Sequence, residues 1–168
     1  GDAGDDVIVG GIGDDNFKGN SNGYAYGNDT YQFRKGDGVD IVYDYDPTVG
    51  NMDTVQFMDV ASTDITGVYN SSGNLVLTYG SSDKVTIHSY FNQDSTRIEQ
   101  FKFSDGVTWG LAEIQSIAIN RGTAGDDVLT GYNDGPNQME GLAGNDTLTG
   151  ASKNDTLSGG DGNDTLSG

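Results

Sequence analysis

The sequence predicts an all-β chain in which two glycine-rich repeat blocks flank a segment of ordinary strand patterns. The first observation is a nine-residue unit of glycines, one aspartate and one apolar residue, which recurs near both ends of the chain. The second is a middle segment of short β-branched and aromatic runs bounded by Gly, Asn, Ser or Asp. One stretch, 111–117, is expected to form one or two helical turns. The chain is therefore expected to be a β protein built partly from repeats.

The repeat is most regular near the C-terminus. A regular unit has glycines among its first four positions, an aspartate at the sixth and a large apolar residue at the eighth. The polar and apolar residues after the aspartate alternate, so each unit can form a short strand with one side chain pointing inward. Units begin at Gly122, Gly131, Gly141, Gly150 and Gly159. Their apolar positions are Leu129, Met139, Leu148, Leu157 and Leu166.

The N-terminal block begins regularly and then loses its phase. Units starting at Gly1 and Gly10 carry Ile8 and Phe17 at the apolar position. Residues 20–23 are an insertion, two extra residues precede the unit that begins at Gly36, and a degenerate unit ends at 53–55. Predictions for this block beyond its second unit therefore depend on a less certain alignment of the repeats.

The unit resembles the calcium-binding nonapeptide of RTX (repeats-in-toxin) proteins, G-G-x-G-x-D-x-U-x with U a large apolar residue. Matching runs are Gly1-Asp2-Ala3-Gly4-Asp5-Asp6 and Gly159-Gly160-Asp161-Gly162-Asn163-Asp164. The resemblance implies parallel β-roll blocks, each a calcium-binding solenoid, with Ca²⁺ as the cofactor. The expected fold class is thus all-β, with parallel β-roll blocks flanking a small antiparallel β module that carries a short helix.

The chemistry of the turn agrees with this resemblance. Glycine permits the positive φ values and close backbone approaches that let carbonyl groups point into a six-residue turn. Calcium takes about six to eight oxygen ligands from carboxylates and carbonyls alike, so a carbonyl-lined turn closed by Asp is half of a site. Because two units complete one coil, the turns of units n and n+2 stack. Each ion is expected between such a pair of turns.

This arithmetic predicts about five calcium ions, each between two aspartates of stacked turns. The expected pairs are Asp6 with Asp29, Asp29 with Asp53, Asp15 with Asp40, Asp127 with Asp146, and Asp146 with Asp164. The turn glycines expected to contribute to these metal sites are Gly1, Gly4, Gly10, Gly11, Gly13, Gly27, Gly36, Gly38, Gly122, Gly125, Gly141, Gly144, Gly159, Gly160 and Gly162.

The C-terminal block is expected to bind calcium on one flank only. On the other flank the unit at Gly131 is one residue too long and has Asn137 where the aspartate belongs. The unit at Gly150 has Lys153 where the second turn glycine belongs. A neutral oxygen and a nearby cation both weaken a calcium site, so replacement of Asp155 is expected to be nearly silent for calcium binding.

The middle segment is expected to be a separate module. Strands are expected at 54–57, 65–69, 75–79, 84–88 and 98–103, joined as a meander of antiparallel hairpins. The segment resembles the haemolysin-type calcium-binding protein related domain, through the runs 73–77, 85–91 and 97–106 and through Trp109 and Leu111. The predicted domains are a repeat block at 1–53, this module at 54–120 and a second repeat block at 121–168. The module could cap the open end of the first roll and begin the second.

Composition limits the classes of partner. The formal net charge is -18, and 23 of the 26 acidic residues are Asp, the shorter carboxylate that suits tight turns. Such a chain repels nucleic acid and anionic membrane surfaces, and no apolar run reaches the length of a membrane span. Cysteine is absent, so disulfides cannot cross-link the loops. Because the chain starts on a repeat boundary and stops one residue into another, we expect it to be a fragment of a longer protein.

No residue pattern indicates catalysis. His88 is the only histidine and is expected on a strand, facing solvent or a hydrogen bond. The aromatics Tyr90, Phe91, Phe101, Phe103 and Trp109 are expected in the core, with a sugar-stacking platform as the alternative.

The sequence therefore predicts a non-catalytic calcium-binding segment. The resemblance implies a secreted or cell-surface bacterial protein, exported by type I secretion machinery and folded by calcium outside the cell. The calcium-free repeats are expected to be disordered. The alternative is a ligand-binding module of an adhesin, recognising a surface or glycan, or an accessory domain of a secreted enzyme.

Overall fold

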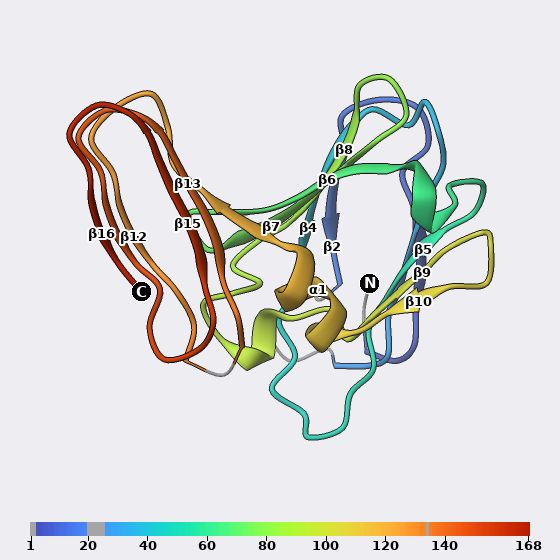
Figure 1. The fold of residues 1–168 in the computed structure, drawn as a ribbon. Coiled ribbons are helices and arrows are strands. Elements are labelled where there is room, and N and C mark those ends of the chain that lie inside the picture. Colours follow the sequence, from blue (N-terminus) through green and yellow to red (C-terminus); the bar gives the residue numbers. More distant parts are fainter. Residues whose placement is uncertain (1–2, 20–25, 134) are drawn as a thin grey trace. The chain divides into compact units, whose positions relative to one another are not determined.

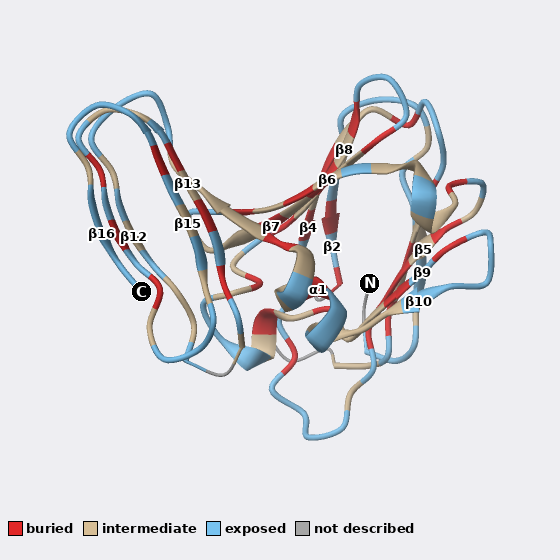
Figure 2. Cartoon of the chain, viewed as in Figure 1, coloured by how far each residue is buried: buried red, intermediate tan, exposed pale blue. Residues whose placement is uncertain are grey.

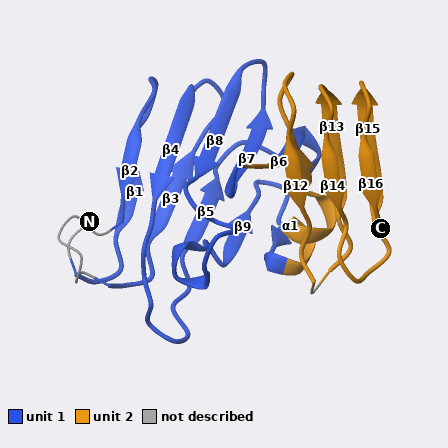
Figure 3. Ribbon diagram, turned by 90° about the vertical axis from the view of Figure 1, so that its left-hand side faces the viewer, with its two compact units in different colours: residues 1–68, 72–111 blue, residues 69–71, 112–168 orange. Residues whose placement is uncertain are grey.

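The protein is described by a computed structural model of residues 3–19, 26–133 and 135–168 (Figure 1). Strands dominate these residues, and they include one α-helix, α1 (Leu111–Ile117), as expected. The chain divides into two compact units, 1–68 with 72–111 and 69–71 with 112–168 (Figure 3). The division into domains at 1–53, 54–120 and 121–168 is one of sequence motifs and stays a prediction. No described helix is long and apolar enough to cross a membrane.

The first unit contains two ladders of parallel strands, which run along opposite walls of a roll. One ladder is built from β1 (Val7–Val9), β3 (Thr30–Phe33), β5 (Thr54–Phe57) and β9 (Gln100–Lys102). The other is built from β2 (Asn16–Lys18), β4 (Val39–Tyr43) and β8 (Asp83–Ile87). Strands of alternate units pair, so the predicted stacking of units n and n+2 is confirmed.

Buried residues of the two ladders form the core of the first roll (Figure 2). Phe17 from β2 meets Phe33 from β3 edge to face, with ring centroids 5.1 Å apart. Tyr31, Phe33 and Val42 have no exposed surface. The apolar positions Phe17 and Tyr31 therefore point inward, as the repeat pattern predicts, whereas Ile8 in the first unit is partly buried. Apolar burial holds the opposing ladders together.

The middle segment continues the roll instead of forming an independent meander. β8 adds to β4 and β9 adds to β5, both in parallel register. Antiparallel strands then cover the outer edges: β7 (Asn74–Tyr79) pairs with β8, and β10 (Thr108–Trp109) pairs with β9. The predicted strand positions are right, and the predicted hairpin of β7 and β8 is confirmed. The predicted meander is wrong for β9, which pairs in parallel with β5, and β8 also pairs in parallel with β4, because the exposed edges of the two ladders offer free backbone groups.

Aromatic residues of the middle segment lie in the core of the first unit. Tyr90 and Phe101 are fully buried, and Phe103 stacks on Phe57 at 5.1 Å with nearly parallel rings. Trp109 packs edge-on against Phe103 at 4.5 Å. His88 directly follows β8, stacks on Tyr43 at 4.8 Å and shares a 3.0 Å hydrogen bond with the Ser89 hydroxyl. Burial favours core packing over a sugar-stacking platform for Tyr90, Phe101 and Phe103.

The second unit is a second roll with two parallel ladders. One ladder contains β12 (Val128–Thr130), β14 (Thr147–Thr149) and β16 (Thr165–Ser167). The other contains β11 (Ile119–Arg121), β13 (Gln138–Ala143) and β15 (Thr156–Asp161), and residues 69 and 70 of β6 (Ile65–Ser71) pair with β11. Met139 and Leu148 are buried between the ladders.

Candidate metal centre

The closing aspartates of the second roll form a column along one flank. The backbone N–H of Asp127 donates to Asp146 Oδ1 at 2.9 Å, and the N–H of Asp146 donates to Asp164 Oδ1 at 3.0 Å. Parallel pairing of β12, β14 and β16 places these residues one above the next. The carboxylates of Asp146 and Asp164 are therefore each fixed by the neighbouring stacked turn through Oδ1.

The same hydrogen bond recurs in the first roll despite its irregular repeats. Asp6 N–H donates to Asp29 Oδ1 at 3.0 Å, and Asp29 N–H donates to Asp53 Oδ1 at 2.7 Å. On the other flank Asp15 N–H donates to Asp40 Oδ1 at 3.0 Å. The structure thus brings together all five pairs of aspartates that the sequence predicts.

The second oxygen of several of these carboxylates has no protein partner. Asp146 is 1% exposed, yet its Oδ2 is buried without a hydrogen bond. The same holds for one buried oxygen each of Asp6, Asp15 and Asp40, and for Oδ2 of Asp155 on the flank that the sequence predicts to be damaged. A buried carboxylate oxygen without a donor costs free energy, so these atoms are positioned to bind a cation.

The first glycine of a regular turn lies against Oδ2 of the closing carboxylate, which has no protein partner in Asp146 but accepts hydrogen bonds from the Thr123 N–H and hydroxyl in Asp127. A Cβ atom placed on Gly122 would lie 2.7 Å from Asp127 Oδ2 and 2.7 Å from the carbonyl oxygen of Gly141, the first glycine of the turn stacked next to it. Gly141 has the same neighbours, Asp146 Oδ2 and the Gly159 carbonyl oxygen. We call this arrangement a cradle: the space above a first glycine that is lined by the closing carboxylate of its turn and by an oxygen from the first position of the next stacked turn.

Later glycines in the turn have a different role. Gly144 has a φ of 125° and Gly162 a φ of 135°, values that side chains rarely adopt. Positive φ values also occur at the predicted site glycines Gly4, Gly11, Gly13, Gly36, Gly38 and Gly160. The predicted site glycines without one are Gly10, Gly27, Gly122, Gly125, Gly141 and Gly159, and Gly1 lies outside the described residues.

Burial and mutual repulsion perturb the carboxylates of the first roll. Burial, partly opposed by the hydrogen bond from Asp6 N–H, raises the pKa of Asp29 from 3.8 to about 6. Burial likewise raises the pKa of Asp40 to about 6, with Asp15 as the nearest repelling charge. The ionised form of both groups is therefore less favourable than in water, and a nearby cation would stabilise it.

Glu99 extends the column of the first roll and was not among the predicted site residues. The N–H of Asp53 donates to Glu99 Oε2 at 2.7 Å, as each aspartate N–H does to the next carboxylate. Burial raises the pKa of Glu99 to about 7. Glu99 directly precedes β9, as the closing aspartate of a repeat precedes its strand. This position in the sequence could have identified it as a site residue.

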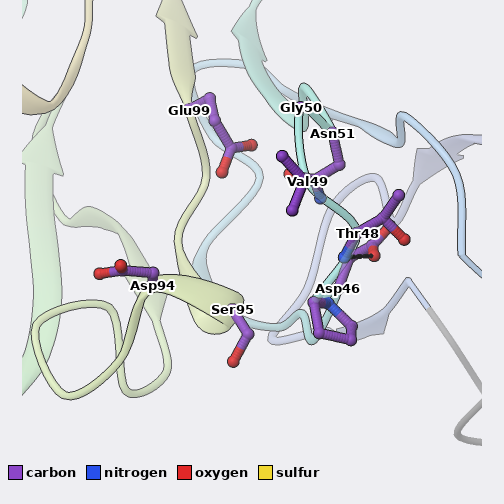
Figure 4. A pocket seen from close by; sticks show the side chains of 9 residues that line it. Asp46, Thr48, Val49, Gly50, Asn51, Asp94, Ser95 and Glu99 are labelled. Atoms are coloured by element: carbon purple, nitrogen blue, oxygen red, sulfur yellow. Dashed lines mark hydrogen bonds between the residues drawn. The ribbon is translucent and has the colours of Figure 1, made fainter.

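Glu99 also lines a cavity of about 570 Å³ with the loop 46–51 and Ser95 (Figure 4). Asp94, which also lines it, forms an ion pair with Arg97 at 2.6 Å. Asp46 accepts hydrogen bonds from the N–H groups of Gly27 and Thr48. The acids around this cavity are thus engaged with protein donors.

The opposite flank of the second roll is filled by an amide. Asn137 is 4% exposed, and its N–H donates to Asp155 Oδ1 at 2.9 Å, which continues the column pattern. Its side-chain Nδ2 faces four oxygens: the carbonyls of Gly150, Tyr132 and Gly135 at 2.8, 3.1 and 3.2 Å, and Asp155 Oδ1 at 2.9 Å. Lys153 is exposed. The turn of Asn137 is therefore ordered around an N–H donor group, whereas Asp155 Oδ2 on the same flank has no hydrogen-bond partner.

The donor set fits calcium. Among the described residues, no three His, Cys, Asp or Glu side chains gather where they could hold a metal by themselves. The cradles instead combine carboxylate and backbone carbonyl oxygens, the hard ligands that calcium accepts in flexible numbers. Cysteine is absent from the chain and His88 is not among the neighbours of the first glycines, so oxygen is the ligand type.

Stacked glycine turns, aspartate columns and parallel ladders define a calcium-binding repeat protein. The profile of the RTX calcium-binding nonapeptide repeat (four copies) matches residues 1–22, 121–134 and 140–168. The profile of the haemolysin-type calcium binding protein related domain matches residues 74–113. The chain is thus a calcium-binding segment of the RTX type.

Known proteins show similar sequences and folds. The chain is 36% identical over 118 residues to the iron-regulated protein FrpA of Neisseria meningitidis serogroup C; the match covers 67% of this chain and 10% of that protein. The chain thus spans about a tenth of the length of this relative. The extracellular lipase LipA from Serratia marcescens superposes with a TM-score of 0.44 at 24% identity, covering 98% of this chain and 26% of the lipase.

Proposed function

We propose that this segment is a non-catalytic module that folds when calcium fills the cradles of its two rolls. The observation that carries the proposal is the buried Oδ2 of Asp146, which lies against Gly141 and has no hydrogen-bond partner. The other oxygen of this carboxylate, Oδ1, accepts a hydrogen bond from the N–H of Asp127. Asp146 lies in the middle of its column and serves two neighbouring turns. Without a cation, the folded roll holds negative charge in a site closed to water, which opposes folding.

The free energy available from calcium is comparable with the stability of a domain. At a dissociation constant of about 10⁻⁴ M, in the range for extracellular modules, a tenfold excess of calcium adds roughly 1.4 kcal/mol per site. About five sites then add on the order of 7 kcal/mol, close to the whole stability of a typical domain. At the far lower free calcium inside a cell, this contribution nearly vanishes.

This concentration dependence supports a secreted or cell-surface location for the parent protein. A chain that stays unfolded at low calcium suits type I secretion, which exports an unfolded chain, and the calcium outside then drives folding. The RTX repeats support this assignment. The parent's own activity is a separate matter, because this segment spans a small part of its relative.

We assign five ions, one to each stacked pair of aspartates, and none to the turn of Asn137. The amide Nδ2 of Asn137 faces the oxygens that line this turn and so takes the position of the cation. The two N–H bonds of the Asn137 side-chain amide place partial positive charge among these oxygens, so this turn can form without calcium.

Comparison of calcium with magnesium tests the proposal. Magnesium demands near-octahedral geometry at shorter distances and gives up water reluctantly, so a carbonyl-lined cradle should favour calcium. We expect millimolar calcium to raise the thermal unfolding midpoint far more than millimolar magnesium at equal ionic strength, measured by scanning calorimetry. Equal stabilisation by the two ions would rule out cradles of this kind and reduce the effect to screening of charge.

A further inference from the structure

Gly19 is a first glycine although the repeat is interrupted directly after it. Its N–H donates to the Tyr43 carbonyl at 3.3 Å, as the N–H of Gly131 donates to Thr149 at 2.8 Å in the regular roll. β2 pairs with β4 so that Lys18 lies opposite Tyr43. Gly19 follows Lys18 and Asp44 follows Tyr43, so in this register Asp44 lies opposite Gly19. Asp44 thus occupies the first position of the next stacked turn, where the second roll has glycine.

The cradle at Gly19 has an unusual lining. A Cβ atom on Gly19 would lie 2.7 Å from Asp29 Oδ2 and 2.7 Å from Asp44 Oδ1, with the Tyr31 hydroxyl oxygen beside them. In the cradle at Gly122, a backbone carbonyl oxygen takes the place that Asp44 Oδ1 takes here. A carboxylate oxygen therefore replaces a neutral ligand at an equivalent point of the roll.

Asp44 has a free oxygen, whereas the neighbouring Asp53 does not. Asp44 is 6% exposed, and its Oδ2 is buried without a hydrogen-bond partner. Asp53 accepts the Asp29 N–H on Oδ1 and the Asn51 side-chain amide on Oδ2 at 2.6 Å. For an ion bound near Asp29, Asp44 is the better placed source of a second charged oxygen.

The electrostatic environment also calls for a cation. Asp29 Oδ2 and Asp44 Oδ1 line the same cradle, and both residues are buried. Ion pairs elsewhere in the described structure engage Asp64, Asp94 and Glu140. Two buried carboxylates facing one cradle are stable together only if they share a proton or bind a positive ion.

We propose that Asp44 is a calcium ligand at the cradle of Gly19, so that this site binds its ion through two carboxylates from different turns. The inference rests on the proposed calcium function. It adds a ligand that the nine-residue pattern does not contain. It also assigns the ion between the stacked turns of Asp29 and Asp53 to Asp29 and Asp44. An added ligand charge raises calcium affinity, so this site should be the first to fill.

Replacement of Asp44 tests the inference through the number and affinity of bound ions. Asp44→Asn removes the charge at constant size, and Asp44→Gly restores the residue of a regular turn and so guards against misfolding. Asp59→Asn is the matched control, because Asp59 is exposed in the same unit and lies outside the cradles. The readout is calcium stoichiometry by native mass spectrometry, with isothermal titration for the tightest site, after circular dichroism confirms folding in calcium.

We expect both Asp44 variants to lose the tightest calcium site of the wild-type protein, and Asp59→Asn to retain it. If the wild-type protein binds calcium and both Asp44 variants keep its stoichiometry and tightest affinity, Asp44 is not a ligand and instead shares a proton with a neighbouring acid. If the wild-type protein binds no calcium, the proposed function itself fails. The two failures are thus distinguishable.

Discussion

At the scale of single residues, Asn137 and Asp146 show how one side chain sets the chemistry of a turn. Both donate their backbone N–H to the carboxylate of the next stacked turn. Asp146 leaves a carboxylate oxygen facing its cradle, whereas Asn137 fills the equivalent space with an amide that donates to surrounding oxygens. The sequence predicts the loss of the carboxylate at 137, but the inward orientation of its amide depends on the irregular turn around it.

Asn137→Asp should create a calcium site. The new carboxylate would face the oxygens that now accept hydrogen bonds from Nδ2, so the calcium-free protein should lose on the order of 1–3 kcal/mol of unfolding free energy. In calcium, one additional ion should bind, which native mass spectrometry can count. Asn154→Asp, which adds the same charge at an exposed position of the same flank, should bind no additional ion. An unchanged stoichiometry for Asn137→Asp would contradict the assignment of this turn.

At the scale of elements, the ladders explain which strands the sequence could predict. β5 and α1 have the predicted bounds, because local patterns of apolar residues and turn residues determine them. The pairing of β8 with β4 and of β9 with β5 was missed, since it joins residues 46 or so positions apart and no repeat marks it. Glu99 and Asp44 were missed for the same reason: their role is fixed by register between strands.

The two flanks of the second roll should respond differently to loss of a carboxylate. Asp146→Ala removes the residue shared by two stacked pairs, so we expect two ions fewer by isothermal titration. Asp155→Ala should leave the calcium stoichiometry unchanged. It should still lower stability by about 1–3 kcal/mol, because both N–H groups of Asn137 that bond to Asp155 Oδ1 lose their acceptor. A larger loss of calcium for Asp155→Ala than for Asp146→Ala would show that the flanks are assigned the wrong way round.

At the scale of the whole molecule, charge and fold are matched through calcium. The net charge of -18 opposes compaction, and the structure concentrates carboxylates in columns where a divalent ion can neutralise them. Fold class and aspartate pairs were predictable because the repeat spacing encodes them. The balance between bound protons and bound calcium could not be predicted from the sequence, because it depends on how deeply each carboxylate is buried.

Stability without calcium should fall as the pH rises. Burial raises the pKa of Asp29 and Asp40 to about 6 and that of Glu99 to about 7, so the calcium-free folded state binds more protons than the unfolded state. This contribution is fully present below the ordinary pKa of about 4 and is lost between about pH 4 and pH 7, with Asp44 extending the loss toward pH 9. Circular dichroism of calcium-stripped protein at pH 5 and pH 8 measures it, and we expect a larger folded fraction at pH 5. Greater stability at pH 8 would contradict the burial of these groups.

The most direct test of the account is a calcium titration of the stripped protein followed by far-ultraviolet circular dichroism. Calcium supplies the positive charge that the aspartate columns lack, so the spectrum should change from coil-like to β-rich, steeply, between chelator and millimolar calcium. A spectrum that is already β-rich in chelator at neutral pH, and that stays unchanged to millimolar calcium, would show that the rolls fold without the ion and that the central claim is wrong.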